Sequence, residues 1–390
     1  QFSNCVFDGS YCNKDWYVQD PKGRPFLYYT GRYMTCISHP EWLEHLREMV
    51  RGVIDTGADG VYIDNPWHGI QPIHLGGAWM APAGCYCSLC RDAFRGATGI
   101  EIPESVSPEL DEASQRYLVW RAGQITETMA MLGAYARSLE KNVVFGANDY
   151  DAVMRPSYVV HGIDLPALAA VQDVIMIEDF CLPCWEKGML TNNAITLRTA
   201  QALIGDTPLS TDPYDRGIGW DDVYPSRRFQ QGIAEAAACG STMVVKGTEY
   251  VDGEGTFTLL TAKRYRPQRE AIGQFHRWLE NQAELYQERV NIAPVGLLHP
   301  GDAMWQAWDR LAPLYFRAGQ TLLAAGIPWR VVTASDDLSG LEVLLCFDEP
   351  AAEAEPVQTP RVLDVPSLPG WEVASPSFLA RHDALRAVAS

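Results

Sequence analysis

The chain has 390 residues, of which 47% are hydrophobic and 21% charged, as in an ordinary globular protein. Its formal net charge of −18 argues against a nucleic-acid partner, because phosphates need a basic surface. No apolar run in the sequence reaches the roughly 18 residues of a membrane helix, so we expect no membrane partner. The length suits one large domain plus a small one.

Strand-like and helix-like segments alternate over most of the chain. Short strands are predicted at 5–7 and 26–29, and a helix at 38–56 in which Ser38 and Glu41 form a capping box. A short buried strand follows at 61–63. The alternation then continues with a helix at 112–141, a strand at 143–147, a short helix near 165, a strand at 174–177, a helix at 193–203, a strand at 208–211, a helix at 226–239, a strand at 243–245 and a helix at 267–284.

This alternation predicts a parallel sheet with right-handed crossovers. Polar residues that converge at the carboxyl ends of strands are typical of a (β/α)8 barrel active site. No glycine-rich phosphate loop follows any strand, which argues against a doubly wound sheet. We therefore predict an α/β protein with a TIM-type barrel over residues 1–288, whose first one or two strands precede Gln1. The strand ends concerned are Asp64-Asn65, Asn148-Asp149, Glu178-Asp179, Thr211-Asp212 and Lys246.

A small second α/β domain is predicted over residues 289–390, because the character of the sequence changes near 292. Strands are expected at 294–298, 329–332 and 343–347, with a helix at 307–325. The segment 349–360 is rich in Pro and Glu and is predicted to be a loop.

Cys85-Tyr86-Cys87-Ser88-Leu89-Cys90 places three thiols within six residues. This spacing suits zinc, which prefers four tetrahedral thiolate or imidazole ligands. Cys36 is the best candidate for the fourth ligand, with His68 and His74 as alternatives. Four thiolates would leave no coordination position for substrate or water, so we expect a structural ion. A second pair, Cys181 and Cys184, is interpreted as two thiols in a loop, with a redox pair as the alternative.

Glycoside hydrolysis needs two carboxyl groups, one acting as an acid and the other as a nucleophile or base. Asp64 follows three apolar strand residues, which predicts a position at the barrel mouth; the alternative is an Asp that caps the loop. Glu178 follows the apolar run 174–177, so its surroundings should be poorly solvated, as a general acid requires. The first alternative for this role is Asp179, followed by Asp149, Asp212 and Glu249. The predicted substrate-binding residues are Asn65, Trp67, His68, Asn148, Asp149, Asp179, Asp212, Tyr214 and Lys246.

The segment from Gly57 to Asp64, the cysteine run and Phe94 resemble the glycoside hydrolase family 42 β-galactosidases and related barrel proteins. The resemblance implies a second domain of flavodoxin-like or amidotransferase-like fold that helps to build a trimer. In that family the acid/base is a Glu in an Asn-Glu pair after the fourth strand, whereas this chain has Asp64-Asn65-Pro66 there. An Asp at this position is similar to barrels of the α-galactosidase and α-fucosidase type, in which it is the nucleophile. The zinc ligands that the resemblance implies are Cys36, Cys85, Cys87 and Cys90.

We therefore expect a glycosidase that cleaves an oligo- or polysaccharide, with Asp64 as nucleophile and Glu178 as acid/base in a retaining mechanism. Structural zinc is the only cofactor expected. The clustered cysteines favour a reducing, cytoplasmic location, with secretion as the alternative, and we expect a homo-oligomer, a dimer or trimer. Two alternatives remain. A carbohydrate-binding barrel without catalysis is favoured by the missing Asn-Glu pair, and a hydrolase that uses zinc directly would need an open coordination position.

Overall fold

The computed structural model describes residues 1–7, 13–29, 32–67, 84–104, 106, 110–151, 153, 156–180, 182–183, 185–186, 189–190, 192–213, 221–245, 250–251, 257–286, 291–347 and 361–364. The chain divides into two compact units, one comprising Gln1–Tyr150 with Arg155–Met176 and the other Asp151–Met154 with Ile177–Ser390. This division falls inside strand β7 (Val174–Phe180). The boundary expected at 288/289 stays a prediction.

The main sheet has six strands in the order β1-β5-β6-β7-β10-β12. The pairs β1–β5, β5–β6 and β10–β12 are all parallel. The strands stand in sequence order, as in a (β/α)8 barrel, whereas a doubly wound sheet reverses its order at a switch point. Over the described residues these strands do not close into a barrel. The bounds not yet given are β1 (Phe2–Ser3), β5 (Gly60–Asp64), β6 (Val144–Tyr150), β10 (Leu209–Pro213) and β12 (Ser241–Met243).

The strands predicted at 5–7 and 26–29 exist, but they lie outside the main sheet. Strands β2 (Cys5–Phe7), β4 (Arg32–Met34) and β3 (Leu27–Tyr29) form a separate antiparallel sheet in that order. Their interpretation as barrel strands is therefore wrong. Strand β4 lies between β2 and β3 and forms backbone hydrogen bonds with both, so the two strands pair within the small sheet. The two-residue strand β1 is instead the strand that lies beside β5 in the main sheet, and it pairs Ser3 with Asp64.

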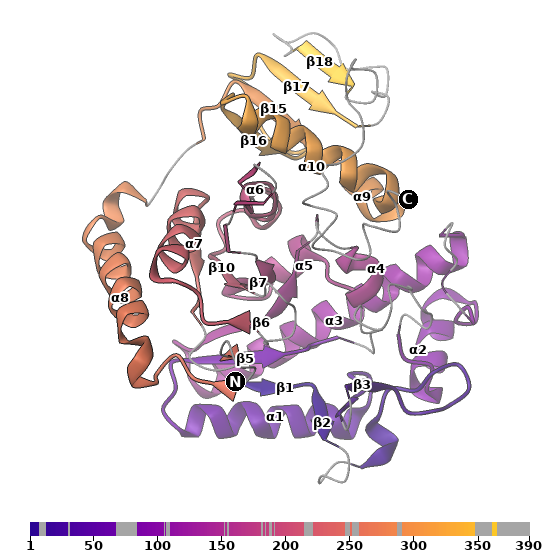
Figure 1. The fold of residues 1–390 in the computed structure, drawn as a ribbon. Helices are drawn as coiled ribbons and strands as arrows, with labels where there is room; N and C mark the ends of the chain where they lie inside the picture. The colour runs from indigo at the N-terminus through magenta and orange to yellow at the C-terminus, as the bar shows by residue number, and fades with distance from the viewer. Residues whose placement is uncertain are drawn as a thin grey trace. The chain divides into compact units, whose positions relative to one another are not determined.

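In the first unit, α1 (Pro40–Asp55) runs alongside β1 and β5 (Figure 1) and buries Trp42, Leu46 and Val50. The helix begins one residue later than the predicted capping box requires. His39 occupies the N-cap without a side-chain hydrogen bond. Glu41 instead accepts a hydrogen bond from Trp16 Nε1 at 3.0 Å. The other helices of this unit are α2 (Ser88–Thr98), α3 (Glu112–Leu139), α4 (Ser157–His161) and α5 (Leu165–Ala169).

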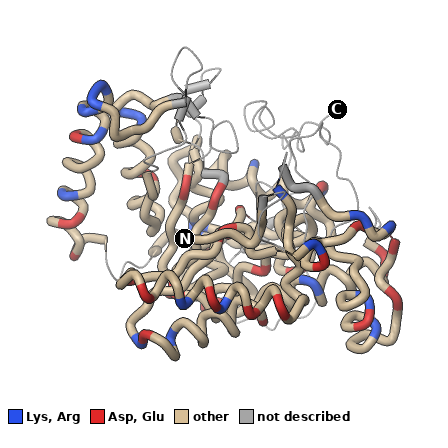
Figure 2. The backbone as a smooth tube through the Cα atoms, turned by 90° about the horizontal axis from the view of Figure 1, so that it is seen from below, with Lys and Arg blue, Asp and Glu red and all other residues tan. Residues whose placement is uncertain are grey.

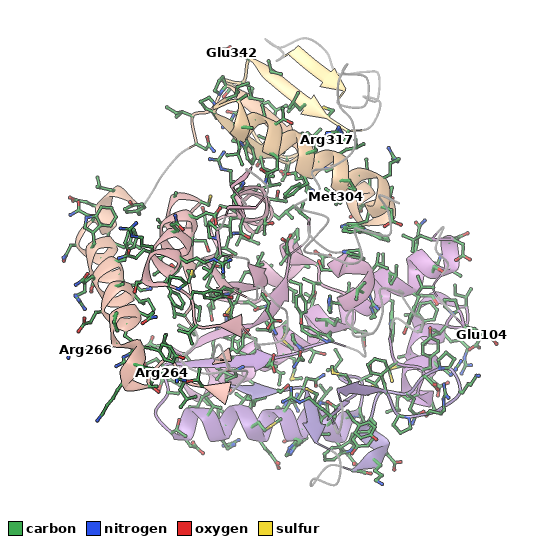
Figure 3. The ribbon with its side chains drawn as sticks, in the orientation of Figure 1. Glu104, Arg264, Arg266, Met304, Arg317 and Glu342 are labelled. Carbon is green, nitrogen blue, oxygen red and sulfur yellow. The ribbon has the colours of Figure 1, made fainter. Side chains whose placement is uncertain are left out.

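The second unit contains a four-stranded parallel sheet in the order β16-β15-β17-β18. Its first strand along the chain, β15 (Val295–Leu298), is flanked by β16 (Trp329–Val332) and β17 (Val343–Cys346), which is the order of a doubly wound sheet. Helix α10 (Trp308–Ala324) lies along this sheet (Figure 1). Met304, in α9 (Ala303–Gln306), is buried in one hydrophobic core with residues of α10 and of this sheet (Figure 3). Strand β18 (Arg361–Asp364) follows the Pro-rich segment and was not predicted from the sequence.

The remaining helices of the second unit match their predicted positions within a few residues. They are α6 (Ala194–Ile204), α7 (Ser226–Ala238) and α8 (Arg266–Asn281), and α7 packs against α8. The shorter elements of the chain are β8 (Trp185–Glu186), β9 (Met189–Leu190), β11 (Asp221–Asp222), β13 (Tyr250–Val251) and β14 (Phe257–Thr258), with the 3-10 helices η1 (Lys14–Trp16), η2 (Lys263–Tyr265) and η3 (Ala283–Leu285).

Charged residues of both signs are spread along the described backbone (Figure 2). Basic residues gather at the start of α8, where Arg264 and Arg266 lie (Figure 3), and Arg266 pairs with Glu270 one turn later. Within the part of the chain that the structure describes, no helix has the length and apolar character needed to cross a membrane.

Candidate active site and thiolate cluster

Asp64 is the last residue of β5, and two amide side chains hold its carboxylate. Asn148 Nδ2 donates to Oδ1 at 3.0 Å, and Asn65 Nδ2 donates to Oδ2 at 2.8 Å. Asn148 comes from β6 and lies beside Asp64, because the parallel register pairs the preceding residues, Ile63 and Ala147. Side chains at equivalent register positions leave a sheet on the same face. The ionised carboxylate, which only accepts hydrogen bonds, is the form that suits these two donors.

Strand β1 completes this side of the site. Asn65 Nδ2 also lies 3.1 Å from Ser3 Oγ and 3.5 Å from Cys5 Sγ. Ser3 Oγ and Cys5 Sγ are themselves 3.0 Å apart. Burial raises the pKa of the Cys5 thiol to about 11, so the thiol is neutral at physiological pH. The ends of three neighbouring strands thus contribute polar groups around one carboxylate.

A buried asparagine fixes the backbone beneath this cluster. Asn4 accepts a hydrogen bond from Trp42 Nε1 at 2.7 Å and donates to the carbonyl oxygens of Thr35 and Trp67, each at 3.2 Å. The backbone N–H of Asn4 donates to the backbone carbonyl oxygen of Asp64 at 2.9 Å. Asn4 therefore ties the end of β5 and the start of its loop to β1 and α1.

Trp67, predicted to stack on substrate, is completely buried. Its ring packs against Tyr150 and His161, with ring centroids 4.8 and 5.1 Å away. The structure therefore gives Trp67 a packing role against Tyr150 and His161, and a contact with substrate stays a prediction.

Asp149, also predicted to bind substrate, is completely buried as well. It follows Asn148 on β6, so its side chain leaves the opposite face of the sheet. Neither carboxylate oxygen has a hydrogen-bond partner of normal geometry. Burial raises the pKa of Asp149 to about 8, and the nearby Gln172 side chain and Met176 backbone N–H lower it by smaller amounts. A carboxyl group in this position is protonated at neutral pH and has no solvent-facing surface.

The other predicted site residues are less completely defined. Glu178, on β7, and Asp212, on β10, are both half-buried, and both belong to the second unit. Asp179 follows Glu178 on β7, but its side chain lies outside the part that the structure describes. Asp64 belongs to the first unit, so its pairing with Glu178 stays a prediction. The residues that lie outside the described part of the chain are His68, His74, Cys181, Cys184, Tyr214 and Lys246.

Four buried cysteines, Cys36, Cys85, Cys87 and Cys90, bring their sulfur atoms within 4.8 Å of one another. Cys36 Sγ lies 3.8 Å from Cys87 Sγ and 3.5 Å from Cys90 Sγ. Four thiolates bound at about 2.3 Å to a tetrahedral ion have sulfurs about 3.8 Å apart, so this cluster fits one metal ion. Hydrogen bonds from the neighbouring thiols of Cys36, Cys85 and Cys90 lower the pKa of Cys87.

The thiolate cluster joins segments that are distant in sequence. Cys36 lies two residues after the end of β4 and precedes α1, whereas Cys90 lies in the first turn of α2 and Cys87 is its N-cap residue. The Cys36 amide N–H donates to the Trp16 carbonyl at 2.7 Å, which fixes its backbone. An ion bound here would therefore link the small antiparallel sheet to the start of α2.

No protein-family model and no curated protein matches the sequence. Among solved structures, the chain has the fold of the glycoside hydrolase family 42 β-galactosidases, as its cysteine motif predicts. It is similar to a catalytic mutant of a family 42 β-galactosidase from G. stearothermophilus, with a TM-score of 0.59 and 15% identity over 85% of this chain and 54% of that one.

Two further structures are similar to the same degree. The β-galactosidase from Bacillus circulans sp. alkalophilus matches with a TM-score of 0.59 and 14% identity over 85% of this chain and 54% of that one. The α-L-fucosidase isoenzyme 2 from Paenibacillus thiaminolyticus matches with a TM-score of 0.55 and 16% identity over 86% of this chain and 45% of that one. The chain spans about half the length of these structures, and at such identities the likeness establishes the fold alone.

Reasoning from the sequence missed three residues of the cluster around Asp64: Ser3, Asn4 and Cys5. Their positions depend on the pairing of β1 with β5, whose partners are about sixty residues apart in sequence. The local signal is the short apolar run at 5–7, which predicts a strand without indicating its neighbour.

Proposed function

We propose that the protein is a glycoside hydrolase that cleaves an oligo- or polysaccharide, with Asp64 as its nucleophile. The observation that carries this proposal is the Asp64 carboxylate, held by Asn65 and Asn148 at the carboxyl end of a strand in a barrel-type sheet. Catalytic groups occupy this end of the strands in TIM-barrel enzymes. The structural neighbours are named as β-galactosidases and an α-L-fucosidase, which supports a sugar substrate.

In the proposed retaining mechanism, Asp64 attacks the anomeric carbon while Glu178 donates a proton to the departing oxygen. The glycosidic C–O bond breaks and an ester bond to Asp64 forms. Water then attacks the anomeric carbon, Glu178 takes its proton, and the ester bond breaks to release Asp64 as a carboxylate. Asn65 and Asn148 support the first step by holding the attacking carboxylate in one orientation.

We infer that the thiolate cluster holds a structural zinc ion bound by Cys36, Cys85, Cys87 and Cys90. Four thiolates complete a tetrahedral shell and leave no position for water, so the ion would act on the fold rather than on the substrate. We further propose that the barrel domain spans residues 1–288 and the second domain residues 289–390. The protein is also proposed to form a homo-oligomer and to be located in the cytoplasm.

The first test is hydrolysis of a panel of α- and β-linked nitrophenyl glycosides by wild type, Asp64→Asn and Glu178→Gln. Asp55→Asn, at an exposed position in α1, is the matched control for loss of one carboxylate. We expect activity on one sugar, a loss of at least 10³-fold in Asp64→Asn, and full activity in the control. An active Asp64→Asn variant would remove Asp64 from the mechanism. Sugar binding without hydrolysis would support a carbohydrate-binding barrel instead.

A further inference from the structure

We propose that Asn65 is a positioning residue that locks the Asp64 carboxylate to the end of the neighbouring strand β1. This inference rests on the proposed function, in which Asp64 is the nucleophile. Asn65 then acts by holding the Asp64 carboxylate in place rather than by contacting the substrate.

The amide nitrogen of Asn65 has more acceptors than hydrogens. Its two N–H groups face three acceptors: Asp64 Oδ2 at 2.8 Å, Ser3 Oγ at 3.1 Å and Cys5 Sγ at 3.5 Å. The shortest contact goes to the carboxylate, as expected for a charge-assisted hydrogen bond. The second hydrogen is left for Ser3, the last residue of β1. Asn65 therefore bridges the carboxylate of one strand end to the hydroxyl of the next.

This bridge requires an unusual backbone. Consecutive residues of an extended strand point to opposite faces, so a regular strand would direct Asn65 away from Asp64. Asn65 instead has φ of 55°, in the left-handed region, which turns its side chain back toward its predecessor. Among described residues other than glycine, only Leu110 shares a positive φ. Asn adopts this conformation more readily than most residues with a Cβ, because its short polar side chain can hydrogen-bond locally, and such conformations cluster at functional sites.

The two asparagines act on different oxygens of the carboxylate. Asn148 holds Oδ1 from β6, and Asn65 holds Oδ2. Together they prevent rotation of the carboxylate plane, and Asn65 is itself 4% exposed, so its position is fixed by packing. A misplacement of about 1 Å in a reacting group can reduce the rate by roughly 10²-fold, so loss of one support should lower the rate of the chemical step.

Glycine and alanine at position 65 separate this role from a purely structural one. Both substitutions remove the amide, but Gly accepts a positive φ without strain whereas Ala retains the strain. If Asn65 served only to form the turn, Asn65→Gly would be as active as wild type. We expect instead that kcat falls 10- to 100-fold in both variants, with KM changed less than threefold. Asn65→Gly should also unfold at a higher temperature than Asn65→Ala.

Ser3→Ala tests the other end of the bridge. It leaves the turn and the amide in place but removes the hydroxyl that fixes the amide, so kcat should fall 2- to 5-fold with unchanged KM. Wild-type kcat in both Asn65→Gly and Ser3→Ala, measured alongside an inactive Asp64→Asn, would overturn the inference while leaving the proposed nucleophile intact. An active Asp64→Asn would instead overturn the proposed function.

A measurement independent of activity covers the case in which none of the panel glycosides is cleaved. Crystal structures of wild type and Asn65→Gly at the same pH would compare the orientation of the Asp64 carboxylate. We expect it to rotate away from its wild-type position or to become disordered in the variant, with Asn148 still in contact with one oxygen. An identical, equally well-ordered carboxylate in both structures would show that Asn65 does not position it.

Discussion

Asp149 offers the sharpest test of the energetics of this fold, because a lone carboxyl group is completely buried on the face of β6 opposite to Asn148. Burial raises its pKa from 3.8 to about 8. In the unfolded chain the carboxyl is ionised above about pH 4, whereas in the folded protein it keeps its proton up to about pH 8. The folded state therefore binds one more proton in this window, and the free energy of unfolding falls as the pH rises through it.

The size of this effect follows from the pKa difference. Each pH unit between the two pKa values costs about 1.4 kcal/mol of stability, so the Asp149 carboxyl removes about 2.7 kcal/mol between pH 5 and pH 7. Asp149→Asn keeps the shape of the side chain and cannot titrate. The difference in unfolding free energy between variant and wild type should therefore grow by about 2.7 kcal/mol from pH 5 to pH 7, whatever the fixed cost of the amide.

Urea unfolding followed by tryptophan fluorescence at pH 5 and pH 7 measures this difference directly. All other titrating groups are shared by the two proteins and cancel in the comparison. Asp55→Asn, at an exposed position in α1, controls for loss of one negative charge from an acidic chain. A stability difference that is equal at the two pH values, or larger at pH 5, would refute the reasoning.

Three further predictions concern the metal, a buried hydrogen-bond hub and helix packing. Cys87→Ser should reduce bound zinc, measured by mass spectrometry of the purified protein, from about one ion per chain to near none, while Cys346→Ser, outside the cluster, should retain it. Asn4→Ala should lower the unfolding free energy in urea by about 2–4 kcal/mol, because it leaves buried groups without partners; a loss below about 1 kcal/mol would contradict this. Gly319→Ala in α10 would put a Cβ 2.5 Å from an Ile195 carbon and should cost about 1–3 kcal/mol, whereas Gly52→Ala, in open space on α1, should be neutral or stabilising by up to about 1 kcal/mol.

The amino-acid pattern alone determined most of the secondary structure. Apolar periodicity and end signals placed the long helices α1, α3, α7 and α10 within two residues of their observed bounds. These features are local, because a helix is recognised from side chains three and four positions apart. The cysteine spacing likewise predicted that three thiols would gather at one site, since they lie in one short segment, and Cys36, the preferred fourth ligand, lies beside them.

Tertiary structure decided which strands are neighbours and what each polar residue contacts. The strand at Cys5–Phe7 was predicted correctly but placed in the wrong sheet, because a strand pattern carries no information about its partner. Asp64 and Asn148 were both predicted at strand ends, but the hydrogen bond between them depends on the register of β5 against β6.

The contrast between Asn148 and Asp149 has the same origin. The two residues are adjacent in sequence, and both were predicted to bind substrate. Strand geometry sends them to opposite faces, so one supports the candidate nucleophile and the other is buried as a neutral acid. The sequence determined that polar groups would gather at the strand ends. Only the pairing of segments far apart in the chain determined which of those groups meet, because burial and hydrogen bonding depend on neighbours in space.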